Sequence, residues 1–493
     1  MNVAIFHSFA RQAFGFRRST FNLDKLATTA RGVGISLILA VGFPISTNAE
    51  SLADALASAY NHSGLLHQNR ALLRAADEDV ATTVSGLRPI ISWSTDLTRS
   101  FSHSPNPAPT GGSIRTGDTD LNAGITAQLL LYDFGLKRLQ IEAAKESVLA
   151  TRQTLISVEQ QVLLRAVQAY MNVQRNFEFV ALRESNLRVI RESLRAAKDR
   201  FEVGEVTRTD VAQAEARLSS AQSGLAIAQG DLAQAVEEYA SAIGHRPGRL
   251  SPPRNLPNIS RSVDSAKVVA LRSHPDMVKA QHDVAAAELN VTAAQAAMNP
   301  TISLKGSLGV NEELNSSNFA QTGSVGIQLT GPIYQGGALS SAKRRAMAQR
   351  DALRGVLHIT RHNVRQNVGN AYAILRAARA TSQASTQEVR AAQVAFRGVR
   401  EEASLGQRTT LDVLDAEQEL LNARANQISA QADVYIAAYT VLSVTGQLTT
   451  RHLNLGVQTY DPAAYYDLVK DAPTQLSPQG KKLDRVLRAL GKE

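Results

Sequence analysis

The sequence predicts an internally duplicated membrane protein of mixed α and β structure, in which a long α-helical coiled-coil part joins a transmembrane β-barrel completed by oligomerisation. Three observations indicate this fold class. A series of residues with the same order and spacing occurs twice in the 493-residue chain. Each copy contains a helical span too long for a compact domain, and apolar and polar residues alternate in short segments before that span. Aromatic residues make up 5% of the chain, which also disfavours a large globular enzyme.

Residues 1–49 have the three-part layout of a secretory signal peptide. Basic residues precede the apolar run GVGISLILAVGFPI, and the small residues Thr47 and Ala49 stand before a cleavage position. The run has about 14 residues, too few to span a bilayer as a helix, so an uncleaved anchor is the weaker alternative. We expect the mature chain to begin at Glu50.

Charge, cysteine content and hydropathy limit the partners and the membrane segments. The net charge of +9 falls once the basic signal peptide is removed, so nothing indicates a nucleic-acid partner. The absence of cysteine excludes disulfides and thiolate metal sites. After residue 49, no segment has the roughly 18 consecutive apolar residues of a transmembrane helix. If the protein enters a membrane, it does so with strands.

The duplication is visible as a shift of 202 residues, which aligns Tyr132 with Tyr334 and further glycines and aspartates without a gap. We expect a first structural repeat at 50–262 and a second at 263–455. Each would consist of a leading helix, two transmembrane strands and a long helical hairpin. A polar periplasmic tail would follow at 456–493.

Long helices are predicted in both repeats, after leading helices at about 51–86 and 264–297. From Leu136 to Val203 the chain has neither proline nor glycine, which corresponds to roughly 100 Å of helix. The second copy has no proline between Pro332 and Pro462. Helices of this length must pack along one another as coiled coils, because propensity alone does not stabilise them in water.

A similar turn ends the long helix of each copy. Gly406 supplies a left-handed residue, and Thr409 can cap the next helix together with Asp412, three positions later. The first copy repeats the arrangement with Gly204, Thr207 and Asp210. Each turn therefore predicts a tight helical hairpin.

Four segments alternate as transmembrane strands do, with one face for lipid and one for water. They lie at 89–97, 121–132, 301–310 and 324–331. A half-buried soluble sheet would alternate in the same way, but the export signal and the polar loops between the segments favour the membrane. Four strands cannot close a barrel, whose minimum is about eight, and an open edge is forbidden in lipid. The chain must therefore oligomerise.

Several motifs resemble those of the TolC family of outer membrane efflux proteins. They include LLLYDFGLKR and GPIYQGGALSSAKRRA where strands lead into helices, and RFEVGEVTRTDV and SLGQRTTLDVLDA at the helical turns. The resemblance covers nearly all of the mature sequence. It implies a homotrimer whose twelve-stranded barrel lies in the lipid of the cell outer membrane and continues as an α-helical tunnel across the periplasm.

The same resemblance implies a function. Such a protein is the passive exit duct of a tripartite efflux or type I secretion system, conducting drugs or exported proteins to the outside. A periplasmic adaptor and an inner-membrane transporter are its partners. The adaptor is expected to dock at the hairpin tips, which comprise Val203, Gly204, Leu405 and Gly406.

The resemblance also assigns residues to the closed entrance. Asp412 and Asp415 match the acids of the pore constriction, and a trimer would present six such carboxylates, a ring that favours cations. Arg408 matches an arginine that closes the entrance by contacts to a neighbouring hairpin, where Thr209 and Asp210 match its partners. An acid in the first turn of a helix is also stabilised without any function, and Asp210 in particular fits a role as a capping acid alone.

Ala403 stands where the family has a tyrosine, so one closing contact is expected to be missing. A periplasmic coiled-coil scaffold without channel activity is the alternative function, but it does not explain the alternating segments. An enzyme is not expected, because no nucleophile–base pair, phosphate loop or metal cluster has a recognisable spacing. His358 and His362 are four residues apart on a helix but lack a third ligand, so neither a metal nor a cofactor is expected.

Overall fold

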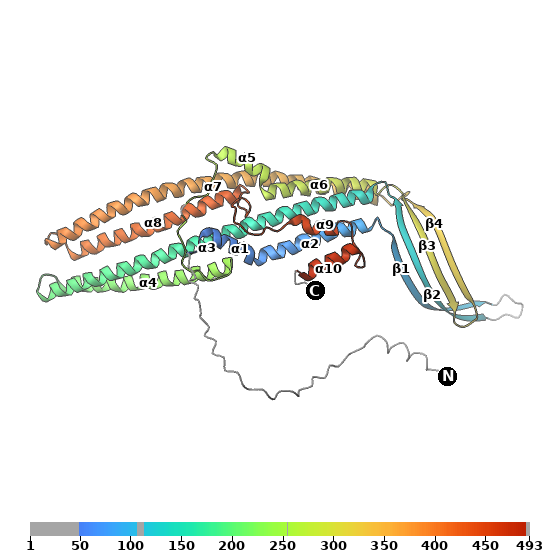
Figure 1. The fold of residues 1–493 in the computed structure, drawn as a ribbon, viewed down its shortest axis with the longest axis horizontal. Coiled ribbons are helices and arrows are strands. Elements are labelled where there is room, and N and C mark those ends of the chain that lie inside the picture. Colours follow the sequence, from blue (N-terminus) through green and yellow to red (C-terminus); the bar gives the residue numbers. More distant parts are fainter. Residues whose placement is uncertain (1–48, 106–112, 254, 490–493) are drawn as a thin grey trace, which may run out of the picture. The chain divides into compact units, whose positions relative to one another are not determined.

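A computed structural model of the chain describes residues 49–105, 113–253 and 255–489. The predicted signal peptide lies outside these residues except for Ala49, so its removal stays a prediction. The described part follows one plan twice: two helices, two strands, a long helix, and a helix that returns along it (Figure 1). The predicted internal duplication is confirmed.

Each leading segment, predicted as one helix, consists of two. The four helices are α1 (Leu52–His62), α2 (Gly64–Ser85), α5 (Val263–Ser273) and α6 (Pro275–Ala296). Ser63 and His274 have non-helical ψ angles of 110° and 129° and cap the second helix of each pair. Pro275 has no N–H with which to continue the preceding helix. The prediction of unbroken helices over 51–86 and 264–297 is therefore wrong at these two caps.

The long helices form two hairpins. They are α3 (Leu136–Glu202) with α4 (Arg208–Ile243), and α7 (Ala338–Ser404) with α8 (Thr410–Val444). Both α3 and α7 have 67 residues. Alanines are buried along α4 at a spacing of seven residues, namely Ala214, Ala221, Ala228 and Ala235. Because a heptad of small apolar residues lets two helices approach along their length, the packing agrees with the predicted coiled coil.

The strands form one antiparallel sheet in the order β1-β2-β3-β4. They are β1 (Ile90–Pro105), β2 (Ser113–Tyr132), β3 (Thr301–Glu313) and β4 (Phe319–Thr330). The register places Trp93 opposite Ile125, and Ile125 opposite Leu308, so apolar residues are aligned across three strands. The pairing of β2 with β3 joins the two repeats, while β1 and β4 are the edges. All four predicted strands are present and are longer than the alternating segments.

Within the described residues, none of the helices has both the length and the apolar character that crossing a membrane requires.

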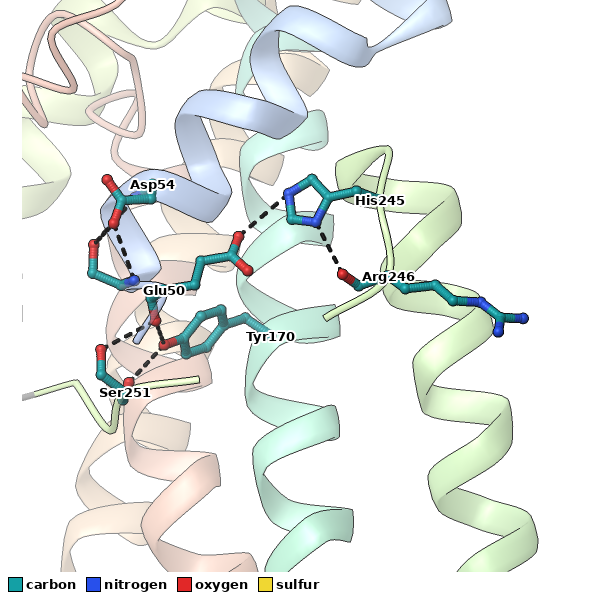
Figure 2. A network of polar contacts seen from close by, with 7 residues as sticks. Glu50, Asp54, Tyr170, His245, Arg246 and Ser251 are labelled. Carbon is teal, nitrogen blue, oxygen red and sulfur yellow. Dashed lines mark hydrogen bonds and ion pairs between the residues drawn. The ribbon is translucent and has the colours of Figure 1, made fainter. Parts of the chain in front are cut away.

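The residue at which the mature chain is predicted to begin is tied into the helical core (Figure 2). The backbone N–H of Glu50 donates to the carbonyl of Arg249 at 2.8 Å, and its own carbonyl accepts from the N–H of Ser251 at 2.9 Å. The hydroxyl of Tyr170, a fully buried residue of α3, lies 2.9 Å from the Glu50 carbonyl and 2.6 Å from that of Ser251. Glu50 is thus docked between α3 and the segment after α4.

The C-terminal tail, for which the sequence predicted only a polar character, contains helices. It contains α9 (Pro462–Val469) and α10 (Pro478–Ala489), and α9 packs against α2. The hydroxyl of Tyr465 donates to Glu78 at 2.7 Å, and Arg88 donates to the carbonyls of Asp471 and Ala472. These contacts hold the tail on the first leading segment.

Candidate functional site

The two hairpin tips have the same backbone geometry. Gly204 and Gly406 have φ angles of 80° and 77°, the left-handed values that favour glycine at a helix end. The N–H of Glu205 donates to the carbonyl of Arg200 at 2.9 Å, and that of Gln407 donates to Glu402 at 3.0 Å. These bonds satisfy carbonyls that the helix ends would otherwise leave without partners. Beside the glycines, Val203 and Leu405 are 71% and 75% exposed.

Both predicted capping arrangements are present. The carboxylate of Asp412 accepts from the N–H of Thr409 at 2.9 Å and from its hydroxyl at 2.8 Å, and the Asp412 N–H donates back to that hydroxyl oxygen. Asp210 and Thr207 form the same box. In each box two hydrogen bonds from the threonine hold the pKa of the aspartate below its usual value. The bond from the backbone N–H has the larger effect, and the bond from the hydroxyl has the smaller one. Both acids thus remain ionised at the tips.

Arg408 pairs within its own hairpin. Its Nε donates to Oε2 of Glu402 at 2.8 Å. Among the described residues of one chain, no contact joins Arg408 to Thr209 or Asp210, whose carboxylate is held by Thr207. The contact predicted for closure would therefore have to come from the hairpin of another copy.

Asp412 and Asp415 do not share a partner, although they are three residues apart on α8. Arg217 of α4 donates to Oδ1 of Asp415 at 2.5 Å. The sequence did not predict this ion pair, which joins residues of different hairpins. Arg217 lies seven residues after Asp210, so the two share a face of α4, but this spacing does not identify Asp415 as the partner.

A cavity of about 300 Å³ lies between the hairpins beside Ala403. Its wall includes apolar residues of three long helices and two arginines, among them Ala197, Phe396, Leu414, Arg200 and Arg400. Ala403 itself is 8% exposed, so it is part of the packed wall. The position at which the resemblance predicts a missing closing contact thus borders a gap between the hairpins.

Glu417 is a buried acid that sequence reasoning missed. It is 6% exposed, and its Oε1 accepts from Nδ2 of Asn186 on α3 at 3.0 Å, while Oε2 has no hydrogen-bond partner among the described residues. Burial raises the pKa of Glu417 from 4.5 to about 7, although Asn186 and Arg400 both oppose the shift. Because a buried carboxylate with one oxygen lacking a partner is costly when charged, we expect the contact of α3 with α8 at Glu417 to depend on pH.

Replacement of Glu417 by glutamine is expected to stabilise the protein above neutral pH. The pKa of Glu417 is higher in the folded state than in the unfolded state. The free energy of unfolding of the wild type is therefore at its full value below pH 4.5 and decreases as the pH rises through about 7. The glutamine variant lacks this loss, which amounts to roughly 3 kcal/mol when complete. Thermal unfolding of both proteins at pH 5 and pH 8.5 measures it. Similar melting temperatures at pH 8.5 would contradict the burial of a charge.

Comparison with known proteins places these features in a family. The family model described as "Outer membrane efflux protein" matches residues 55–245 and 268–447. The chain is 37% identical to the outer membrane efflux protein BepC of Brucella suis over 424 residues, covering 86% of this chain and 91% of BepC. It is 24% identical to the outer membrane protein TolC of Escherichia coli over 440 residues, covering 85% and 86% of the two chains.

The fold is also similar to that of a solved structure. The Campylobacter jejuni CmeC outer membrane channel matches with a TM-score of 0.70 at 18% identity, over 92% of this chain and 98% of CmeC. The channels of the TolC family are not enzymes, in agreement with the prediction from the sequence. The alternative of a periplasmic scaffold loses its support. The chain belongs to the outer membrane efflux protein family, and it is an outer membrane channel with long periplasmic helices.

Proposed function

We propose that three copies of the chain form a passive exit duct that receives drugs or exported proteins from an inner-membrane transporter through a periplasmic adaptor. The observation that carries this proposal is the sheet with two free edges. Within one chain β1 and β4 each pair on one side only. Backbone groups without partners are not tolerated in lipid, so β1 of one copy would pair with β4 of the next. Three sheets of four strands give a closed twelve-stranded barrel.

The exposed face of the sheet supports contact with lipid. On β4, the side chains of Val325, Ile327 and Leu329 are 83%, 72% and 67% exposed. They alternate with glycine and glutamine, as expected for a strand with one apolar and one polar face. On β1, Trp93 continues this exposed apolar surface at 78%. A soluble protein rarely leaves so much contiguous apolar surface in water.

The tips support the proposed entrance and its partners. Asp412 and Asp415 would form the pore constriction of the trimer, and Arg408 would contact Thr209 and Asp210 of an adjacent copy to keep it closed. The exposed Val203 and Leu405 each place an apolar side chain directly before the glycine of a turn, which suits docking of the adaptor. Each of these roles depends on the neighbouring copies.

The proposal is tested with the purified full chain in planar bilayers. Wild type is expected to behave as a trimer on chemical cross-linking and to form cation-selective channels. Asp412→Asn combined with Asp415→Asn should remove most of the cation selectivity and the block by divalent ions, because the ring loses its charge. Glu237→Gln combined with Glu238→Gln is the control, since it makes the same charge change near the end of α4 that is far from the hairpin tips. A monomer or dimer, or an equal loss of selectivity in the control, would refute the proposal.

A further inference from the structure

We propose that Arg217 is a positioning residue of the entrance: its ion pair with Asp415 ties the second hairpin of each chain to the first and neutralises one of the two pore acids while the entrance is closed. The inference rests on the proposed function and adds a residue and a coupling to it. Its basis is the 2.5 Å contact between a guanidinium nitrogen of Arg217 on α4 and Oδ1 of Asp415 on α8. These residues are 198 positions apart in the sequence.

The pair differs from its neighbours in what it connects. Lys198 and Glu215 form an ion pair at 2.8 Å between α3 and α4, within the first hairpin. Arg408 and Glu402 are also 2.8 Å apart and stay within the second hairpin. The pair between Arg217 and Asp415 crosses from one hairpin to the other. Breaking it therefore affects how the hairpins are held together, whereas breaking either of the other two does not.

An apolar contact fixes the rotation of α8 that this pair needs. Leu414, the residue before Asp415, is 2% exposed and packs in one cluster with Leu187, Ile190 and Ala221 of the first hairpin. Successive side chains on a helix point about 100° apart, so the burial of Leu414 against α3 and α4 determines where Asp415 can point. Asp415 keeps a side-chain exposure of 57%, and Arg217 one of 37%. The carboxylate is thus held at the surface of the seam and is not enclosed in it.

The surroundings of Asp412 and Asp415, the two proposed pore acids, consequently differ in the structure. Asp412 accepts hydrogen bonds from neutral groups of Thr409 and forms no ion pair among the described residues, although the charge of Arg408 nearby also helps to lower its pKa. Asp415 has the cation of Arg217 beside it, so a distant ion experiences little net charge from the pair. A movement that separates α8 from α4 breaks the pair and leaves Asp415 without its cation. Opening the entrance would then increase the negative charge of the ring, so that conductance and cation selectivity rise together.

The test uses full-length trimers of Arg217→Gln in planar bilayers, with the conductance and the reversal potential in a salt gradient as readouts. A partly exposed ion pair stabilises a contact by a factor of about two to five, so we expect the open-to-closed ratio to rise by about that factor for each chain. The cation-to-anion permeability ratio should rise as well. Arg217→Lys should restore both values towards wild type, and adding Asp415→Asn to Arg217→Gln should remove the gain in selectivity.

Lys198→Gln is the matched control, because it removes a lysine at a similar depth from a pair within one hairpin. It should conduct and select as wild type does. Wild-type behaviour of Arg217→Gln, or an equal change in Lys198→Gln, would overturn the inference while the channel itself stands. A wild-type protein that forms no channel would instead remove the proposed function. If Arg217→Gln does not assemble, Asp415→Asn alone must still raise the conductance, and its failure to do so would also count against the pair.

Discussion

Replacement of Arg408 by alanine is expected to raise the conductance of single trimers severalfold. Three arginines would lose their contacts with Thr209 and Asp210 of adjacent copies, and all three contacts act on the same closed state. Ala403 offers no polar group to replace them, and it lines a cavity of about 300 Å³ between the hairpins. Closed-state contacts that are lost together shift the equilibrium towards the open state by their combined effect. Single-channel recording measures the conductance.

The pair of Arg408 with Glu402 provides the control for this experiment. If the arginine acts only on its own hairpin, Glu402→Gln should change the conductance as much as Arg408→Ala does, because both variants remove the same 2.8 Å contact. If it acts on a neighbouring copy, Asp210→Asn should resemble Arg408→Ala and Glu402→Gln should resemble wild type. A conductance of Arg408→Ala equal to that of wild type would reduce its role to that of a local helix-end contact.

The elements that the sequence predicted well are those with local signals. The capping boxes formed by Thr409 with Asp412, and by Thr207 with Asp210, depend on residues three positions apart. The sequence pattern alone was therefore sufficient to predict them. The strands were found from alternation, and the long helices from the absence of proline and glycine. The breaks at Ser63 and Pro275 were also local: the second could have been predicted from the proline, and the first from a serine that can cap a helix.

The contacts between the hairpins could not be predicted in this way. Arg217 meets Asp415, and Asn186 meets Glu417, across 198 and 231 residues of sequence. Which residues meet is decided by the register of one hairpin against the other, and a register depends on the packing of whole helices. A single sequence carries no local signal for it. The different partners of Asp412 and Asp415 therefore became visible only in the structure.

The duplication helps to explain how the two repeats are held in register. Tyr170 and Tyr372 occupy equivalent positions in α3 and α7, and both reach the segment that links the repeats. The hydroxyl of Tyr170 contacts the carbonyl of Ser251 at 2.6 Å, and that of Tyr372 donates to the carbonyl of Ser260 at 2.9 Å. One linker thus receives a buried tyrosine from each long helix. These two contacts add a fixed point between the long helices and the linker, far from the hairpin tips.

Substitution of Gly446 by alanine is expected to be the most destabilising of the changes considered, and Gly406→Ala is its matched control. The two glycines have φ angles of 78° and 77°, so a Cβ costs each of them roughly the same 1–2 kcal/mol of backbone strain. They differ in the space around that Cβ. At Gly406 nothing lies within 4 Å, whereas at Gly446 the Cβ would lie 2.9 Å from the Cα of His274 and 3.1 Å from the carbonyl oxygen of Ser273.

The atoms near Gly446 belong to the backbone at the break between α5 and α6, so they cannot move away as a side chain could. Displacing them adds about 1–3 kcal/mol for overpacking and disturbs the end of α8 against the second leading segment. Thermal unfolding of detergent-solubilised trimers should show a small decrease in melting temperature for Gly406→Ala and a much larger one for Gly446→Ala. Equal decreases would mean that backbone strain alone limits both positions, and that the close approach of α8 to His274 contributes nothing to the stability of the helical core.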